Sequence, residues 1–169
     1  LVPVARGVVN LPLLEGKVLA NMFFENSTRT RMSFETAMKR LGGSVLNFSS
    51  IGTSVSKGET LYDTMQMIDG YADIAAIRHP RQGAAQYSAD AVEIPILNAG
   101  DGAGNHPTQT MLDLFTIRQS HGDLEGLNVV LVGDLRYGRT VHSLSHALVR
   151  FGASLTLVSP ATLRLSLIH

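Results

Sequence analysis

Hydroxyl and guanidinium side chains gather where an apolar stretch of this sequence gives way to a helical pattern. Residues 18–24 form the apolar stretch, and Ser27, Thr28, Arg29 and Thr30 open the helical one. The first turn of a helix carries free backbone N–H groups and the positive end of the helix dipole, so with three hydroxyls and a guanidinium it suits a phosphate dianion. Arg29 opposes the dipole, which a bound anion would explain. A simple helix cap at Ser27 is the alternative.

Further cations and polar side chains follow apolar runs later in the chain. Arg78 ends the run 73–78, while His106 and Gln109 stand where a glycine-rich loop leads into a helix. His106 can polarise a carbonyl group, and Gln109 can offer an amide oxygen to an N–H donor. Arg139 opens another helix, where a carboxylate ligand would explain a cation. For each of these residues taken alone, a surface or capping role stays open.

Two other patterns carry weaker signals. Lys57 lies near the end of a polar segment, 49–58, with two glycines and five Ser or Thr residues, which predicts a mobile loop whose lysine could reach an anion. His142 and His146 have the i, i+4 spacing of metal ligands, but no third ligand is apparent, so we expect no metal site. The glycine-rich loop lacks the G-x-G-x-x-G fingerprint, which makes a nucleotide-binding domain a weak alternative.

Apolar runs alternate with helical patterns along the chain. Strands are expected at 18–24, 44–48, 73–78, 94–98, 128–133 and 154–159, and helices at 27–41, 59–71, 83–91, 107–121 and 139–151. This alternation predicts an α/β fold with a parallel sheet and helices on both faces. Ligands of such sheets bind at the carboxyl ends of the strands, where the candidate residues fall.

A helix ends near residue 122 and a new βαβ pattern follows. The expected domains are therefore 1–122 and 123–169. One βαβ unit cannot cover both faces of a sheet, so we expect the second α/β domain to be truncated.

Composition narrows the class of protein. Among 169 residues, 44% are hydrophobic, which suffices for a core, and 14 Lys+Arg balance 14 Asp+Glu. Balanced charge gives no reason to expect nucleic acid or a membrane as partner. The chain has no cysteine, so disulfides and thiolate metal ligands are excluded, and no apolar run reaches about 18 residues. We expect a cytoplasmic protein.

Six ordered segments resemble the carbamoyltransferase family, and within it the catalytic chain of the aspartate enzymes. They are residues 24–31, 57–60, 78–80, 98–102, 106–109 and 133–143, within a resemblance that covers about residues 16–160. The Ser-Thr-Arg-Thr-Arg and His-Pro-Thr-Gln segments also occur in ornithine carbamoyltransferases. The segment 133–143 is similar to the aspartate enzymes and favours them.

The resemblance implies that the amine of L-aspartate attacks the carbonyl carbon of carbamoyl phosphate, giving N-carbamoyl-L-aspartate and phosphate in an early step of pyrimidine synthesis. It assigns the phosphate to residues 27–30 together with Arg78. It also implies that Thr30, Arg78 and His106 donate to the carbonyl oxygen, that Gln109 holds the carbamoyl group and that Arg139 binds an aspartate carboxylate. Such a site needs positioning and donors, and no cofactor.

The same resemblance implies a homotrimer with active sites shared between subunits. Ser54 and Lys57 would then serve the neighbouring subunit's site. A separate regulatory chain is compatible with the resemblance, and the sequence leaves that partner open.

The sequence also departs from the family. The Arg-x-Gln pair, the His-Pro-x-Pro loop and the closing helix of the aspartate-binding half are missing, and residues 1–12 and 165–169 do not match the family. We therefore expect a fragment of an aspartate carbamoyltransferase. The alternatives are a fragment of an ornithine carbamoyltransferase and a non-catalytic binding module, although the intact set Ser27, Arg29, Arg78, His106 and Gln109 argues against the module.

Overall fold

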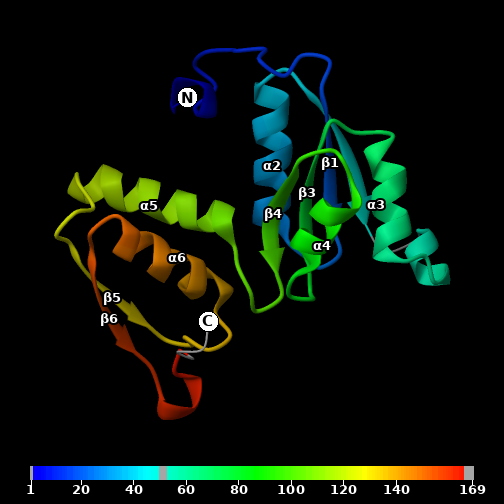
Figure 1. Ribbon diagram of the computed structural model, residues 1–169. Helices are drawn as coiled ribbons and strands as arrows, with labels where there is room; N and C mark the ends of the chain where they lie inside the picture. The colour runs from blue at the N-terminus through cyan, green and yellow to red at the C-terminus, as the bar shows by residue number, and fades with distance from the viewer. Residues whose placement is uncertain (1, 50–52, 166–169) are drawn as a thin grey trace. The chain divides into compact units, whose positions relative to one another are not determined.

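The computed structural model describes residues 2–49 and 53–165, and the chain divides into two compact units, 1–98 and 99–169. Helices and strands alternate in both units (Figure 1). The first unit contains α1 (Val2–Ala5), β1 (Val18–Phe23), α2 (Thr28–Arg40), β2 (Ser44–Ser49), η1 (Ser54–Lys57), α3 (Leu61–Asp69), β3 (Ile74–His79) and α4 (Ala84–Ala91). Strand β4 (Ile96–Asp101) runs across the boundary between the units.

The sheet of the first unit has the strand order β2-β1-β3-β4. Strand β1 pairs in parallel with both β2 and β3, which confirms the predicted parallel sheet. In this register Phe23 lies opposite Ser49 on one side and Arg78 on the other. The turn that follows β1 therefore begins beside Arg78.

Helices cover both faces of this sheet, as the sequence predicts (Figure 1). Ala20 and Met22 of β1 pack with Met65 of α3 and other residues of α3 and α4, whereas Leu19 packs with Met38 of α2. Burial on both faces explains why every residue of β1 except Asn21 is apolar.

The second unit contains α5 (Pro107–His121), β5 (Asn128–Val132), α6 (Arg139–Arg150), β6 (Ser154–Val158) and η2 (Ala161–Leu163). Strands β5 and β6 form a parallel pair whose inner face packs on residues of α5 and α6, with Leu148 fully buried. Val130, Val132 and Val158 are exposed. The predicted domain boundary at 122 lies inside this unit and stays a prediction.

Each predicted helix and strand has a counterpart, and the ends differ by a few residues. Helix α3 begins at Leu61 and not at residue 59, because the Thr60 hydroxyl accepts a hydrogen bond from the Asp63 N–H and so caps the helix. The short helices α1, η1 and η2 have no counterpart in the predictions, because they are too short to show a period. Residues 50–52 of the predicted loop and residues 166–169 of the tail lie outside the described residues.

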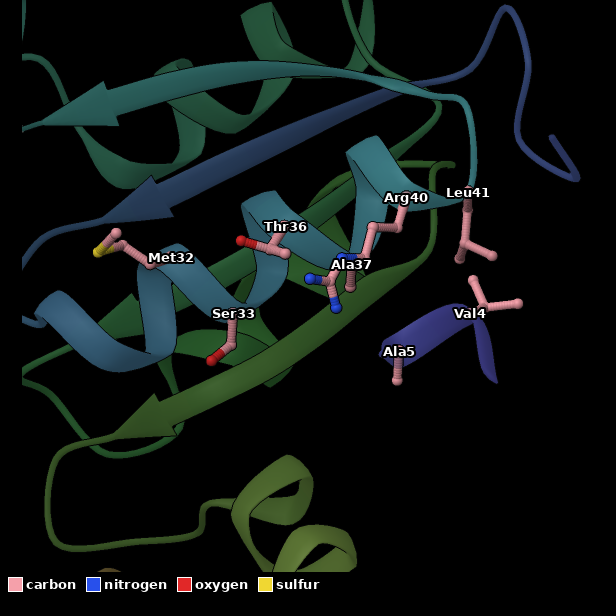
Figure 2. A pocket seen from close by; sticks show the side chains of 8 residues that line it. All are labelled: Val4, Ala5, Met32, Ser33, Thr36, Ala37, Arg40 and Leu41. Atoms are coloured by element: carbon pink, nitrogen blue, oxygen red, sulfur yellow. The ribbon is translucent and has the colours of Figure 1, made fainter. Parts of the chain in front are cut away.

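A largely apolar pocket of about 530 Å³ lies between α1 and α2 (Figure 2). Its lining residues are Val4, Ala5, Met32, Ser33, Thr36, Ala37, Arg40 and Leu41. None of the predicted site residues is among them.

Candidate active site

The N-terminus of α2 is built as an open group of donors. Ser27 occupies the N-cap position with an extended backbone, but its side chain makes no capping hydrogen bond to the helix. The first turn contains no acidic residue, while Arg29 is exposed beside Thr28. The alternative of a simple Ser27 cap is therefore wrong, and the hydroxyl remains suited to an external acceptor.

Arg78 lies against this helix end. Its Nη1 is 3.4 Å from Thr30 Oγ1, and its Nε donates to Glu25 Oε1 at 2.6 Å. The parallel register accounts for the approach, because the Phe24 N–H also donates to the Arg78 carbonyl at 2.9 Å. The sheet thus joins Arg78 to the Ser27–Thr30 turn, and the alternative of an unattached surface arginine is wrong.

Glu25 lies next to Arg78, and the sequence predicts no role for it. The side chains of Arg78 and Glu25 are only 13% and 24% exposed, so their ion pair is partly desolvated. A buried guanidinium needs a charged or hydrogen-bonding partner, and Glu25 supplies it. Glu25 uses the Nε atom of Arg78, which leaves Nη1 on the side of Thr30. The sequence signal was an acid directly ahead of a hydroxyl-rich helix start.

His79 lies on the other face of β3 from Arg78, since successive strand residues alternate. Its ring packs on Phe24 with centroids 5.1 Å apart, and Phe24 packs at the same distance on Phe48. Its Nδ1 accepts a hydrogen bond from the Arg81 N–H at 3.0 Å. Burial, and next the charge of Arg81, lower the pKa of His79 from its usual value. These rings tie together the carboxyl ends of β1, β2 and β3.

In the second unit, His106 is buried at the entrance of α5, with Pro107 in the first helical position. His106 makes no side-chain cap to the helix, so a merely capping role is wrong. Its Nδ1 lies 3.4 Å from Thr108 Oγ1. The Gln109 Nε2 donates to Asp113 Oδ1 at 2.9 Å, which leaves Oε1 as the acceptor that the sequence predicts.

Arg139 and His106 converge on Gly100. The Arg139 Nη1 donates to the Gly102 carbonyl at 3.1 Å. A Cβ atom placed on Gly100 would lie 3.3 Å from His106 Cδ2 and 3.4 Å from Arg139 Nη1. Gly100 also has φ +114°, which favours glycine. The glycine therefore lets a cation and an imidazole approach the same backbone segment.

Two hydroxyls hold the starts of α5 and α6 together. Thr110 Oγ1 donates to Ser143 Oγ at 2.7 Å, and Ser143 Oγ is 3.4 Å from the His106 N–H nitrogen. Ser143 also donates to the Arg139 carbonyl at 3.3 Å. Neither hydroxyl has a role predicted from the sequence, because nothing in a single sequence shows that these two helix starts meet.

Ser54 and Lys57 belong to η1, and both are exposed. No hydrogen bond or ion pair links either side chain to residues 27–30 or to Arg78 in the described part of the chain. The described part of the first unit therefore does not bring these two predicted residues to residues 27–30.

His142 is held by backbone carbonyls: its Nδ1 lies 3.3 Å from Gly104 O and its Nε2 lies 3.0 Å from Leu135 O. Within residues 2–49 and 53–165, no cluster of three or more His, Cys, Asp or Glu side chains has the geometry to hold a metal ion. No helix in those same ranges combines the length and the apolar character that crossing a bilayer requires.

Comparison with known proteins places these residues in a family. The family model described as "Aspartate/ornithine carbamoyltransferase, carbamoyl-P binding domain" matches residues 4–119. The aspartate carbamoyltransferase catalytic subunit of Methanococcoides burtonii is 59% identical over 165 residues, which are 96% of this chain and 53% of that protein. The corresponding subunit of Archaeoglobus fulgidus is 56% identical, over 96% of this chain and 54% of that protein.

Solved structures agree. Aspartate transcarbamoylase from Trypanosoma cruzi, in complex with carbamoyl aspartate and phosphate, matches with a TM-score of 0.90 and 46% identity, over 96% of this chain and 54% of that chain. The catalytic subunit of M. jannaschii aspartate transcarbamoylase matches with a TM-score of 0.87 and 53% identity, over the same shares. The chain spans about half the length of the relatives it matches. It belongs to the aspartate/ornithine carbamoyltransferase family, whose carbamoyl-phosphate-binding domain it contains.

Proposed function

We propose that the natural protein carrying this sequence transfers the carbamoyl group of carbamoyl phosphate to the amino group of L-aspartate. One observation carries the proposal: Arg78 lies 3.4 Å from Thr30 at a helix N-terminus that Ser27 leaves uncapped. A helix dipole, free N–H groups, hydroxyls and a guanidinium together are suited to a phosphate dianion. The high identity to aspartate carbamoyltransferase catalytic subunits supports aspartate as the acceptor.

In the proposed reaction, Ser27, Thr28, Arg29 and Thr30 hold the phosphate together with Arg78. The aspartate nitrogen forms a bond to the carbonyl carbon, and the carbonyl oxygen gains negative charge. The bond from that carbon to the phosphate oxygen then breaks, and the leaving phosphate takes both the electron pair and the proton that the nitrogen loses. Donors fixed in advance lower the barrier, because they need no reorganisation as the charge develops.

The proposed roles of the remaining residues follow from the chemistry of their side chains. His106, together with Thr30 and Arg78, donates to the carbonyl oxygen. Gln109 accepts from the carbamoyl nitrogen through Oε1, an assignment supported by the hydrogen bond of its Nε2 to Asp113. Arg139 binds a carboxylate of aspartate.

We extend the proposal to the assembly. Ser54 and Lys57 are exposed on η1, which fits residues that act in the site of a neighbouring subunit of a homotrimer. A regulatory chain would be a further partner. We also propose that the protein acts in the cytoplasm, in pyrimidine synthesis, and that its carbamoyl-phosphate domain ends at residue 122.

The test is an activity assay on the full natural chain with aspartate or ornithine as acceptor. We expect turnover with aspartate, and we expect Arg29→Ala and Arg78→Ala each to lose about 100-fold or more in kcat, because each removes a donor from developing charge. Arg118→Ala, an exposed arginine in the last turn of α5, is the matched control and should keep normal turnover.

Two results would contradict the proposal. Preference for ornithine over aspartate would indicate that the protein is an ornithine carbamoyltransferase. Normal turnover in Arg29→Ala or Arg78→Ala would contradict the assignment of these residues to phosphate binding.

A further inference from the structure

Asn21 is a fully buried polar residue in the centre of β1. Its Oδ1 is the one buried side-chain nitrogen or oxygen atom without a hydrogen-bond partner among the described residues. Leaving a buried carbonyl unpaired is unfavourable, and the neighbours two residues away on the same face, Leu19 and Phe23, are apolar. Packing alone would therefore favour an apolar residue at this position.

The amide nitrogen of Asn21 makes two contacts. It donates to the Arg31 carbonyl at 3.1 Å and to Asn47 Oδ1 at 3.1 Å. The Arg31 carbonyl belongs to the first turn of α2, directly after the Ser27–Thr30 group. Asn21 thus ties the phosphate end of α2 to the central strand.

Asn47 continues these hydrogen bonds to the next turn of α2. It is the register partner of Asn21 on β2, and its Nδ2 donates to Glu35 Oε2 at 3.2 Å. Glu35 also accepts from Lys39 Nζ at 2.6 Å. These two hydrogen bonds, with that of Lys39 the larger, lower the pKa of Glu35 and keep it an ionised acceptor. Two strands thus hold two successive turns of α2.

We propose that Asn21 is a positioning residue for the phosphate site. It locks the first turn of α2 against β1, so that the hydroxyls and N–H groups of residues 27–30 are already aimed when the anion arrives. The proposal rests on the proposed function, because it deepens the role of that site. A displacement of about 1 Å in a positioned group can cost about 100-fold in rate, so an anchor of this kind can justify an unpaired buried carbonyl.

The experiment compares variants of the full natural chain. Asn21→Leu removes both donors and the unpaired carbonyl, and Asn21→Ala removes the same donors without added volume. The readouts are the dissociation constant of inorganic phosphate by calorimetry, the KM for each substrate, and the thermal midpoint. We expect phosphate affinity to fall about tenfold in both variants, with a matching rise in the KM for carbamoyl phosphate and little change in the KM for aspartate.

Ser88→Ala is the control, because Ser88 is fully buried and its Oγ donates only to the Ala84 carbonyl within α4. It should lower the thermal midpoint without weakening phosphate binding, so a general loss of stability is separable from lost positioning.

Wild-type phosphate affinity in both Asn21 variants would overturn the positioning role and leave the proposed function intact. A wild-type protein that binds neither phosphate nor carbamoyl phosphate would overturn the proposed function, and the positioning role with it.

Discussion

Arg78 contacts groups of opposite character: a carboxylate at Nε and a hydroxyl at Nη1. The guanidinium is planar and offers donors along both edges, so one edge can stay on Glu25 while the other faces a ligand. Such a residue is ordered before the ligand binds. A lysine at this position could not keep both contacts, because it carries a single point charge.

His79 makes stability depend on pH. Its pKa is lowered in the folded state, first by burial and then by Arg81, so the unfolded chain binds the proton more readily. The stabilisation is complete above the unfolded value near 6.5 and is lost as the pH falls through the lower folded value. We expect His79→Gln to flatten the fall in the free energy of unfolding as the pH drops below about 6.5. Denaturant titrations measure it, and equal slopes for both proteins would contradict the assignment.

Single residues were predictable where their chemistry is unusual for their position. Arg29 in a first helical turn and Arg78 at a strand end stood out from the sequence alone. Glu25, Asn21 and Ser143 did not, because their roles depend on which strands and helices lie next to each other. Such contacts come from sheet register and helix packing, which a single sequence does not show.

Among the elements, strand β4 ends on a backbone conformation that favours glycine, at Gly100. Gly100 combines φ +114° with two side-chain atoms, His106 Cδ2 and Arg139 Nη1, that would lie 3.3 and 3.4 Å from a Cβ atom. We expect Gly100→Ala to strain the backbone by about 1–3 kcal/mol and to shift His106 and Arg139 slightly, with kcat/KM falling about tenfold. Denaturant unfolding and steady-state kinetics on the full natural chain measure the two effects.

Gly126→Ala provides the matched control for Gly100→Ala. Gly126 has φ +76°, but a Cβ atom there would meet nothing within 4 Å. It should show a stability cost without the loss of kcat/KM. Equal activity losses in the two variants would mean that crowding at Gly100 is not the cause.

The type and order of the helices and strands were largely predictable, because apolar residues recur with different periods in the two. Strand β1 is a short apolar run and α2 shows apolar residues at helical spacing, so type and order could be assigned. The ends could not, since they depend on local hydrogen bonds such as the Thr60 cap of α3. The order of the strands in the sheet could not be predicted from the sequence either. Strand β1 lies between β2 and β3, and that arrangement is set by how the crossovers pack.

At the scale of the whole molecule, each unit has its own apolar core. Met22 is fully buried in the core of the first unit, so we expect Met22→Ala to lower the free energy of unfolding by about 2–5 kcal/mol. Met67 on α3 is 43% exposed, and Met67→Ala should change the free energy of unfolding by no more than about 0.5 kcal/mol. Denaturant unfolding compares the two, and equal costs would place the core elsewhere.

The position of β1 also orders the assembly of the site during synthesis. The tie between Asn21 and Asn47 joins residues 26 positions apart, whereas Arg78 and Thr30 are 48 positions apart. A ribosome therefore releases β1, α2 and β2 as one contiguous segment before it reaches Arg78. Closing the shorter loop also loses less chain entropy. The turn of residues 27–30 is thus encoded as a local unit, and Arg78 reaches it later, on a strand that pairs with the opposite edge of β1.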